Sequence, residues 1–404
     1  MIDACPLCAA PAQEPFLSLH ELPVHGTQVF DDPGAARTIA RGDQILTYCG
    51  TCGIVFNRAF EASKLDYSAH HEESQFGSAV FRAFANELAD RWVADHALAG
   101  ELVVEVGCGR AEFLDLLVER GAKGIGIDPG ARGADTPDRR LIRDVLRPEH
   151  VPPETKAVVA RHTLEHIEEL EAFAADLAAV GGAGSPAPAL LVEVPSLESV
   201  LERGAFWDLQ YEHCTYFSDP GLENFMARAG YRDPALRRAY DGQYLLGDAT
   251  TWRAPSGSVA ASAPPAALAE ACRRFGDRVT DEVARWSDRL QGAADRGERI
   301  ALWGAGAKGL TFANLLRSSG APMDALVGLV DMNPGLQGLH LGGTGHPIDA
   351  PPRLAEWHPD AIVVMNPVYA EEIAATAEAH LDVELADAGS LDRPASGRCR
   401  VVTV

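Results

Sequence analysis

Short apolar runs and helical patterns alternate along the middle of the chain. Leu102–Val106 and Gly124–Ile127 have the length and composition of buried strands, and the apolar positions of Phe113–Leu117 between them recur at helical spacing. An upstream apolar stripe from Phe81 to Leu98 predicts a helix that leads into the first strand. Further strands are predicted at Leu141–Ile142, Ala157–Ala160, Leu190–Val194 and Asp241–Leu245. The alternation predicts an α/β domain built from βαβ units.

A second array of the same kind fills the last third of the chain. It follows a stretch with the composition of a linker, SVAASAPPAA, and a long amphipathic helical pattern from Leu268 to Leu290. Strands are then predicted at Arg299–Trp303, Leu326–Val330 and Ala361–Met365. We therefore expect two α/β domains, over residues 76–255 and 265–404, preceded by an N-terminal domain over residues 1–75.

The composition limits what the protein binds and where it acts. A chain of 404 residues is long enough for two or three domains, and a net charge of −23 makes nucleic acid and anionic membranes poor partners. We expect no signal peptide, because the N-terminus lacks a basic and an apolar region, and no apolar run approaches the length of a membrane span. These features predict a cytoplasmic protein with reduced thiols and a small-molecule substrate. They leave the oligomeric state open.

Two C-x-x-C pairs lie in the N-terminal domain. Cys5 and Cys8 form the first pair, and Cys49 and Cys52 form the second. The two intervening residues let both thiolates of a pair reach one ion, and two pairs complete the tetrahedral four-cysteine site that is typical of structural zinc. A redox pair would instead open a helix within a βαβ unit. We therefore expect one structural zinc ion, with a hairpin inserted between the pairs.

The first strand of the middle domain ends in the glycine turn Gly107-Cys108-Gly109, and the second strand ends in Asp128. Glycine lets the backbone approach a ligand closely, and a carboxylate in this position can accept both hydroxyls of a ribose. Glu105 precedes the turn and would repel a pyrophosphate, so the loop suits a cationic ligand. The segment resembles the class I S-adenosylmethionine (SAM) methyltransferases, which implies that Glu105, Gly107, Gly109 and Asp128 line the SAM site. A generic nucleotide fold is the alternative.

Two further segments follow strands of the same domain. Asp144 follows the third strand, where folds of this class place a group near the adenine amine, so we expect it to contact the cofactor. His162 and His166 lie in the sequence HTLEH after the fourth strand. Such a spacing binds zinc in inverted zincins, but a protease would need the motif in the middle of a helix. We therefore expect His162 to pack near SAM and His166 to open the next helix.

Residues 205–218, AFWDLQYEHCTYFS, crowd titratable groups among aromatic side chains. They follow a strand and are expected over the carboxyl edge of the sheet, where ligands bind in open α/β folds. Histidine titrates near neutrality, so His213 suits a general base, and Glu212 or Tyr211 could orient it or shuttle a proton. A structural aromatic loop is the alternative.

With this loop the chain resembles the SAM-dependent C-methyltransferases of deoxysugar biosynthesis. The shared residues are Glu212-His213 and Tyr216-Phe217-Ser218, Glu165-His166-Ile167, and Asp66-Tyr67. The resemblance implies a class I SAM methyltransferase Rossmann-like domain, flanked by the N-terminal four-cysteine zinc domain and a C-terminal Rossmann-like domain. It also implies that Tyr67 and Tyr216 bind the substrate. The loop departs from the family pattern at Gln210, Tyr211 and Cys214, where the family typically has Tyr, His and Tyr.

The C-terminal array has a glycine loop of its own, Gly304-Ala305-Gly306-Ala307-Lys308-Gly309. No carboxylate precedes it, and Lys308 lies at the start of the following helix, so the loop suits an anion. By the family resemblance, Lys308 and its domain help to bind the nucleotide diphosphate end of the substrate. A purely structural domain and a domain that binds NAD are the alternatives.

One main hypothesis follows, with two alternatives. We expect a SAM-dependent C-methyltransferase that methylates a carbon beside a ketone, by the resemblance in a nucleotide-linked keto-deoxysugar. His213, helped by Glu212, Tyr211 and His166, would remove the proton beside the ketone. The altered loop favours the first alternative, a methyltransferase of the same architecture that transfers to O, N or C of a non-sugar natural product. The second alternative is a scaffold that keeps its nucleotide folds for binding alone.

Overall fold

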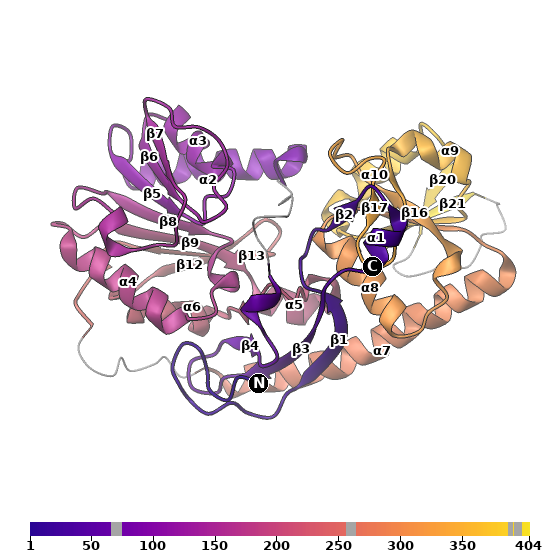
Figure 1. Cartoon of the computed structure of the whole chain (residues 1–404), viewed down its shortest axis with the longest axis horizontal. Helices are drawn as coiled ribbons and strands as arrows, with labels where there is room; N and C mark the ends of the chain where they lie inside the picture. The colour runs from indigo at the N-terminus through magenta and orange to yellow at the C-terminus, as the bar shows by residue number, and fades with distance from the viewer. Residues whose placement is uncertain (66–74, 256–263, 387–390, 392–397) are drawn as a thin grey trace.

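The computed structural model describes residues 1–65, 75–255, 264–386, 391 and 398–404. Two α/β lobes stand side by side, and the N-terminal strands and one long helix join them at the base (Figure 1). Each predicted α/β domain supplies the sheet of one lobe. The domain boundaries themselves stay predictions, and Tyr67 lies outside the described residues.

The middle lobe has a seven-stranded sheet in the order β12-β13-β9-β8-β5-β6-β7. Its strands are β5 (Leu102–Val106), β6 (Lys123–Ile127), β7 (Arg139–Ile142), β8 (Ala157–Arg161), β9 (Ala189–Pro195), β12 (Ala235–Ala239) and β13 (Tyr244–Ala249). Strands β5 to β9 run parallel, and β13 runs antiparallel between β9 and β12. This topology confirms the predicted class I methyltransferase fold, and it brings the carboxyl ends of five strands to one edge.

Helices cover both faces of this sheet. Helices α2 (Ala79–Asp95) and α3 (Glu112–Glu119) share one apolar core with it, and α4 (Leu170–Ala183) and α6 (Asp219–Arg228) share another on the opposite face. The apolar stripe predicted upstream of the first strand therefore forms α2. Short elements complete the lobe: α5 (Leu197–Arg203), β11 (Tyr231–Arg232), β14 (Thr251–Trp252), and 3₁₀ helices at Gln75–Gly77, Pro148–His150, Leu164–His166 and Phe206–Asp208.

The C-terminal lobe has a six-stranded parallel sheet in the order β18-β16-β15-β19-β21-β20. Its strands are β15 (Ile300–Trp303), β16 (Leu326–Val330), β18 (Ile348–Asp349), β19 (Ala361–Val364), β20 (Val383–Leu385) and β21 (Cys399–Thr403). Its helices are α8 (Ala307–Ser318), α9 (Leu354–Trp357) and α10 (Ala370–Ala377), with 3₁₀ turns at Met323–Ala325, Pro351–Arg353 and Pro367–Tyr369. Both predicted βαβ arrays are thus confirmed.

The N-terminal domain contacts both lobes. Its strands β1 (Leu17–Pro23) and β3 (Arg41–Tyr48) form the hairpin predicted between the cysteine pairs, and β4 (Val55–Asn57) extends it. Strand β10 (Thr215–Tyr216) of the middle lobe pairs with β4, and β17 (His340–Leu341) of the C-terminal lobe pairs with β2 (Val29–Phe30). The remaining elements here are α1 (Pro33–Arg37) and a 3₁₀ turn at Ala62–Lys64. Two strand pairings therefore cross the predicted boundaries between the domains.

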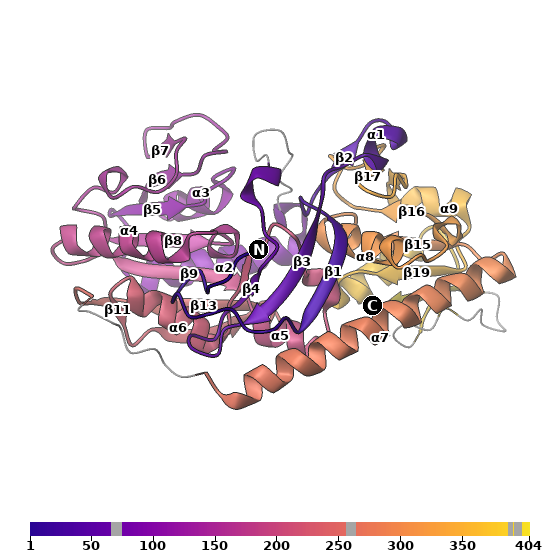
Figure 2. The same ribbon diagram turned by 60° about the horizontal axis from the view of Figure 1, so that its bottom comes forward.

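The predicted amphipathic helix is α7 (Ala266–Arg296), which has 31 residues. It runs along the base of the molecule, from beneath the middle lobe to the C-terminal lobe (Figure 2). A side chain at Gly276 would meet the Phe16 carbonyl oxygen at 2.0 Å, so the helix lies directly against the N-terminal domain. Among the described helices, none has the length and apolarity needed to cross a membrane. The cytoplasmic location stays a prediction.

Candidate functional site

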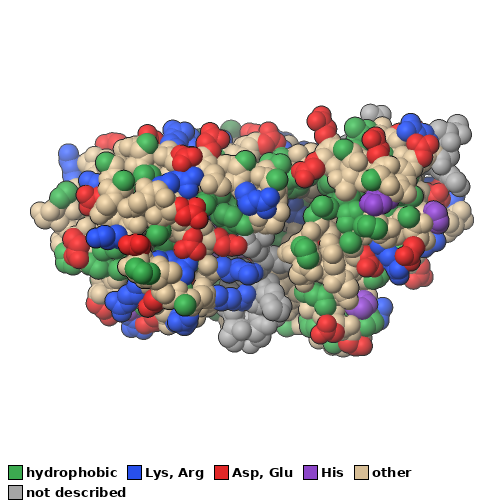
Figure 3. All heavy atoms as spheres, turned by 90° about the horizontal axis from the view of Figure 1, so that it is seen from above, with side chains coloured by type: hydrophobic (Ala, Val, Ile, Leu, Met, Phe, Trp, Pro, Cys, Tyr) green, Lys and Arg blue, Asp and Glu red, His purple; other side chains and the backbone are tan. Residues whose placement is uncertain are grey.

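A cavity of about 1200 Å³ lies between the two lobes. Seen from above, the surface is hollowed between them, and Lys and Arg side chains gather beside the hollow (Figure 3). Gly107 and Asp128 line the cavity from the middle lobe, and Gly306 and Lys308 line it from the C-terminal lobe. The two predicted glycine loops, which are far apart in the sequence, therefore face one space.

On the middle-lobe side, backbone amides bind the side-chain carboxylate of Asp128, the residue that follows β6. Asp128 accepts hydrogen bonds from the amides of Gly109, at 3.0 Å, and Gly130, at 2.6 Å. Gly107 has a φ of 73°, and a Cβ there would lie 2.1 Å from Thr163 Oγ1, so only glycine fits. The structure thus brings Gly107 and Asp128 to the cavity wall, with Gly109 fixing the carboxylate.

Glu105 lies beneath this turn and is not among the described residues that line the cavity. Its side chain is buried, and its Oε2 has no hydrogen-bond partner. Burial raises the pKa of Glu105 to about 8, although the Arg161 guanidinium and the Leu114 amide oppose the shift. The placement does not support the direct cofactor contact that we expected from Glu105.

Asp144 lines the cavity and is partly exposed. Its carboxylate accepts a hydrogen bond from the Val145 amide at 2.8 Å and lies 3.2 Å from Arg147 Nε. The hydrogen bond from Arg147 lowers the pKa of Asp144. An ionised acceptor therefore stands where we expected a contact with the adenine end of the cofactor.

The HTLEH segment contributes to a buried cluster of charged side chains. His162 has a φ of 46°, and its two ring nitrogens lie 2.9 Å from Glu193 Oε1 and 3.3 Å from Glu165 Oε1. Glu193 also receives two hydrogen bonds from Arg161, at 2.8 and 3.1 Å. Burial would lower the pKa of His162, but the two carboxylates raise it to about 9.

This geometry excludes the inverted-zincin arrangement. Leu164–His166 is a single 3₁₀ turn, so His166 does not open a long helix as we expected, and α4 begins only at Leu170. His162 lines the cavity as an imidazolium between two glutamates.

Three side chains meet on the floor of the cavity. Ligand atoms of Glu165, His166 and His213 all lie within 4.8 Å of one another, and the two imidazole rings meet edge to face at 4.9 Å. Burial and the neighbouring His166 lower the pKa of His213 to about 4. His213 is therefore neutral at physiological pH and holds a lone pair that can accept a proton.

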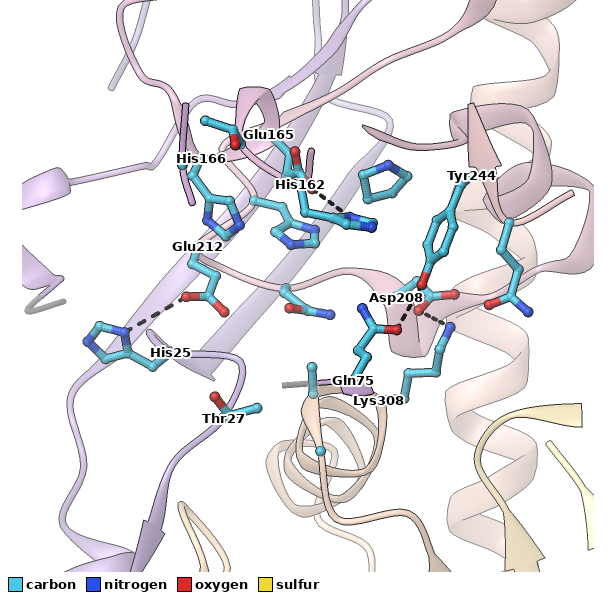
Figure 4. Close-up of a pocket in the computed structure, with 18 of the residues that line it drawn as sticks. His25, Thr27, Gln75, His162, Glu165, His166, Asp208, Glu212, Tyr244 and Lys308 are labelled. Atoms are coloured by element: carbon cyan, nitrogen blue, oxygen red, sulfur yellow. Dashed lines mark hydrogen bonds and ion pairs between the residues drawn. The ribbon is translucent and has the colours of Figure 1, made fainter. Parts of the chain in front are cut away.

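Glu212 is held by the N-terminal domain. The Gly26 amide donates a hydrogen bond to its Oε1 at 2.8 Å, and His25 Nδ1 lies 3.9 Å from Oε2 (Figure 4). Burial alone would raise the pKa of Glu212, but His25, the other site histidines and the amide lower it to about 2. His25 and Thr27 also line the cavity. No sequence pattern pointed to either residue, because their place depends on a contact between distant segments.

Two tyrosines of the predicted site face away from the cavity and are not among its described lining residues. The Tyr211 hydroxyl accepts a hydrogen bond from the Glu61 amide at 2.9 Å, and the ring lies over Gly42. Tyr216 is buried, and its hydroxyl contacts Gln44 Nε2 at 2.7 Å. These contacts correct our expectation that Tyr211 acts in catalysis and that Tyr216 binds substrate: both fasten the loop to the N-terminal domain.

The opposite wall carries Lys308, which forms an ion pair with Asp208 of the middle lobe (Figure 4). Gln75 and Tyr244 lie near this pair, joined by a hydrogen bond of 2.9 Å. The predicted anion site therefore contains a cation that already has a carboxylate partner. An incoming anion would have to share or replace Asp208.

The four N-terminal cysteines converge away from the cavity. Cys5 Sγ lies 3.6 Å from Cys52 Sγ, and Cys8 Sγ lies 3.5 Å from Cys49 Sγ. All four sulfurs lie within 4.8 Å of one another, and three of the four residues are buried. Four converging sulfurs fit a tetrahedral metal ion.

The comparisons with known proteins agree with this geometry. Residues 76–235 match the family of methyltransferase domains, and residues 266–384 match the C-methyltransferase C-terminal domain. The chain is also 25% identical over 398 residues to the C-methyltransferase NovU of Streptomyces niveus, which covers 92% of this chain and 91% of that protein.

Solved structures match a smaller part of the chain. The magnesium protoporphyrin IX methyltransferase of Synechocystis PCC 6803, with bound S-adenosylhomocysteine (SAH), is 15% identical and covers 45% of this chain and 89% of that chain, with a TM-score of 0.32. A SAM-dependent methyltransferase of Archaeoglobus fulgidus is 18% identical and covers 43% of this chain and 100% of that chain, also with a TM-score of 0.32.

Proposed function

This chain belongs to the SAM-dependent C-methyltransferases, and from that premise we propose that it methylates a carbon beside a ketone in a nucleotide-linked deoxysugar. The observation that carries the proposal is the placement of His213. It is a neutral imidazole on the floor of a cavity that both glycine loops line. Carbon is a poor nucleophile until it loses a proton, so C-methylation needs a base between the methyl donor and the acceptor.

SAM, when bound, supplies an electrophilic methyl group. Asp128 is the residue that would hold its ribose hydroxyls, and Gly107 lets the backbone come close to the ligand. Asp144 would accept a hydrogen bond from the adenine amine. The carboxylates of this wall suit a cationic cofactor without phosphate.

His213 would take the proton from the carbon beside the acceptor ketone, and the electrons of that C–H bond would form the enolate. The imidazolium produced by this step lies near the carboxylates of Glu165 and Glu212, which offset part of the effect of burial and of His166, the two main causes of the lowered pKa of His213. His166 contacts the same ring and would assist by contacting the acceptor oxygen. Alignment of the two reactants would contribute further to the rate.

Two features support a nucleotide-linked acceptor. The cavity exceeds the usual volume of a site for one small ligand, which is roughly 300–1000 Å³, so it has room for a cofactor and an acceptor. The N-terminus of α8 and Lys308 line its far wall and would suit a diphosphate that shares or replaces the Asp208 partner of Lys308.

A second candidate function is methylation of a non-sugar acceptor. Gln210 lines the cavity at a position where the family loop typically has a tyrosine. An amide in place of a phenol changes both the acidity and the hydrogen bonding offered to the acceptor. This observation favours an acceptor other than the usual keto-sugar, with transfer to O, N or C.

Hydrogen exchange tests the proposal. A nucleotide-linked keto-deoxysugar is incubated with the enzyme and SAH in deuterium oxide, and the hydrogen beside the ketone is followed by NMR. We expect exchange with the wild type and none with His213→Ala. Methyl transfer from SAM without any such exchange would contradict the enolate route and favour the second candidate.

We also propose that Cys5, Cys8, Cys49 and Cys52 hold one structural zinc ion. Metal analysis of folded protein that has never met a chelator should find about one equivalent of zinc. A variant with Cys5→Ser and Cys52→Ser should lose it. Folded wild type without metal would contradict the assignment.

A further inference from the structure

Three side chains on the floor of the cavity form a second cluster of metal-binding groups, distinct from the four cysteines. Ligand atoms of Glu165, His166 and His213 all lie within 4.8 Å of one another. Glu165 and His166 come from the 3₁₀ turn after β8, where Figure 4 shows them next to each other, and His213 comes from the loop before β10. Two imidazoles and one carboxylate are a ligand set that zinc and iron use in catalytic sites. The cluster therefore has the chemistry of a metal site.

One carboxylate oxygen of Glu165 is free to bind an ion. The residue is 1% exposed, and its Oε2 has no hydrogen-bond partner among the described residues. Its other oxygen, Oε1, lies 3.3 Å from His162 Nδ1, which holds the carboxylate in place. His213 Nδ1 is also buried and has no hydrogen-bond partner in the described structure. Buried polar atoms without a partner are unfavourable, so these two atoms indicate a ligand that binds between them.

The two segments that carry the three ligands are fixed against each other. The Cys214 thiol, next to His213 in the chain, donates a hydrogen bond to the Glu165 carbonyl at 3.4 Å. Strand β10 begins at the following residue and pairs with β4 of the N-terminal domain. The rings of His166 and His213 meet at 88°, with their centroids 4.9 Å apart. An ion would therefore find its ligands nearly in place, and binding would need little ordering of the protein.

The surrounding charges allow a cation to enter. The carboxylates of Glu165 and Glu212 both act electrostatically on the two histidines of the cluster. His162 brings a positive charge, but its other ring nitrogen lies 2.9 Å from the Glu193 carboxylate, which offsets that charge. All three ligand residues line the cavity, so an ion could reach them from the solvent and keep a coordination position open on the cavity side.

We propose that Glu165, His166 and His213 bind one divalent transition-metal ion reversibly, and that the bound ion stops turnover by occupying the lone pair of His213. Zn²⁺, Co²⁺ and Ni²⁺ are ions whose preferences fit imidazole ligands. The binding is independent of the reaction, whereas the inhibition rests on the proposed function, in which His213 is the base. Methylation would then respond to free metal ions through a site separate from the four cysteines.

A cobalt titration tests the binding. Co²⁺ is added to the full chain as purified, and the visible and near-ultraviolet absorption is recorded. We expect about one equivalent to produce d–d bands without the thiolate-to-cobalt charge-transfer band that a four-cysteine site would give. The absence of a saturable cobalt spectrum would overturn the proposal, as would a spectrum that always carries the thiolate band.

Variants then assign the ion to this cluster. Glu165→Gln and His166→Gln each remove one ligand and should weaken cobalt binding by at least about tenfold. Glu168→Gln changes an exposed carboxylate three residues after Glu165, and as the matched control it should bind cobalt like the wild type. The affinity for SAH, measured by calorimetry, shows that the middle lobe of each variant is folded. Unchanged cobalt binding in either ligand variant would place the ion elsewhere and overturn the assignment.

Hydrogen exchange beside the acceptor ketone tests the inhibition. The assay with SAH in deuterium oxide is repeated at increasing Co²⁺ concentrations, and exchange should fall with the same midpoint as the cobalt spectrum rises. Undiminished exchange by the cobalt-saturated enzyme would overturn the inhibition, and faster exchange would overturn it in favour of a Lewis-acid role for the ion. An enzyme that shows no exchange even without cobalt would reject the proposed function, while saturable cobalt binding that depends on Glu165 and His166 would still support the metal site.

Discussion

The two glycine loops of this protein share a backbone and differ in charge. After the first strand of each sheet, a glycine amide bonds to the last carbonyl of the neighbouring strand at 2.8 Å, from Gly107 to Ile127 and from Gly304 to Val330. Around the first loop, Glu112 and Asp115 lie in the first turn of α3. The first turn of α8, as described, has no acidic residue and contains Lys308.

This difference separates two properties that a nucleotide fold usually combines. In each lobe the backbone supplies a tight turn and holds a carboxylate, Asp128 or Asp331, at the cavity wall. The helix starts differ: Asp115 is paired with Arg139, and Lys308 is paired with Asp208. The first loop therefore offers Asp128 to a cationic cofactor, whereas an anion at the second loop would have to share or replace Asp208. In the mechanism that we propose, the reaction takes place between the two loops, at His213.

The largest effect on turnover is expected from a change at His213, which belongs to neither glycine loop. His213→Ala should lower turnover by about 10²–10⁴-fold, the usual contribution of a general base. Its affinities for SAH and for nucleotide should not change, because both walls stay intact. Steady-state kinetics and calorimetry measure these quantities, and His20→Ala, which changes an exposed histidine, is the control. Turnover near that of the wild type would reject the base.

A substitution in the N-terminal domain should also lower turnover, because it moves the loop that carries His213. A Cβ at Gly26 would lie 2.4 Å from Glu212 Oε1 and 2.5 Å from Gln210 Oε1. Gly26→Ala should therefore displace the catalytic loop and lower kcat by up to about 10²-fold, since a misplacement of roughly 1 Å can have that effect.

The control for this change is Gly292→Ala, where a Cβ meets only the flexible end of Arg296. Kinetics gives kcat, and circular dichroism shows whether both variants are folded. A normal kcat in Gly26→Ala would mean that the loop does not depend on this contact.

Asp128→Ala tests the comparison of the loops itself. It removes the carboxylate that suits the cofactor ribose, and SAH should bind roughly ten- to a hundredfold more weakly. Nucleotide binding to the C-terminal lobe should stay as it is. If SAH binding also weakened in Asp331→Asn, the division of ligands between the two lobes would be wrong.

The smallest effect concerns pH. Burial lowers the pKa of His213 to about 4, and the base acts only when it is neutral. The rate should therefore fall as the pH drops through about 4 and should vary by less than about twofold between pH 5 and 8. The pH dependence of kcat/KM measures this, with NMR of the His213 ring as an independent check. An inflection near 6.5, where an unperturbed histidine titrates, would contradict the burial of this ring.

The sequence predicts the central strands of both lobes closely, because they are short apolar runs, several of which end in glycine or a carboxylate. It does not predict the peripheral strands β12, β18, β20 and β21. Leu102–Val106 and Leu326–Val330 have the predicted bounds. The residues Gly107, Asp128, His166, Glu212 and His213 are found as site residues because they follow such strands.

The parts that the sequence does not predict depend on tertiary contacts. His25 enters the site because its segment lies against a loop that is 186 residues away from Gly26. Tyr211 stands beside Glu212 in the sequence, yet its side chain points into the N-terminal domain. Sequence patterns identify which residue types share a loop, but the direction of each side chain is decided by what the loop packs against.

The pairing of β2 with β17 sets an order in time. Val29 and Phe30 pair with His340 and Leu341, which lie about 310 residues later in the chain. The segment that carries His25 and Gly26 therefore gains this strand partner only after residue 341 has been synthesised. A growing chain can form the sheet of its middle lobe before that point, but it cannot yet form the strand pair that ties this segment to the C-terminal lobe.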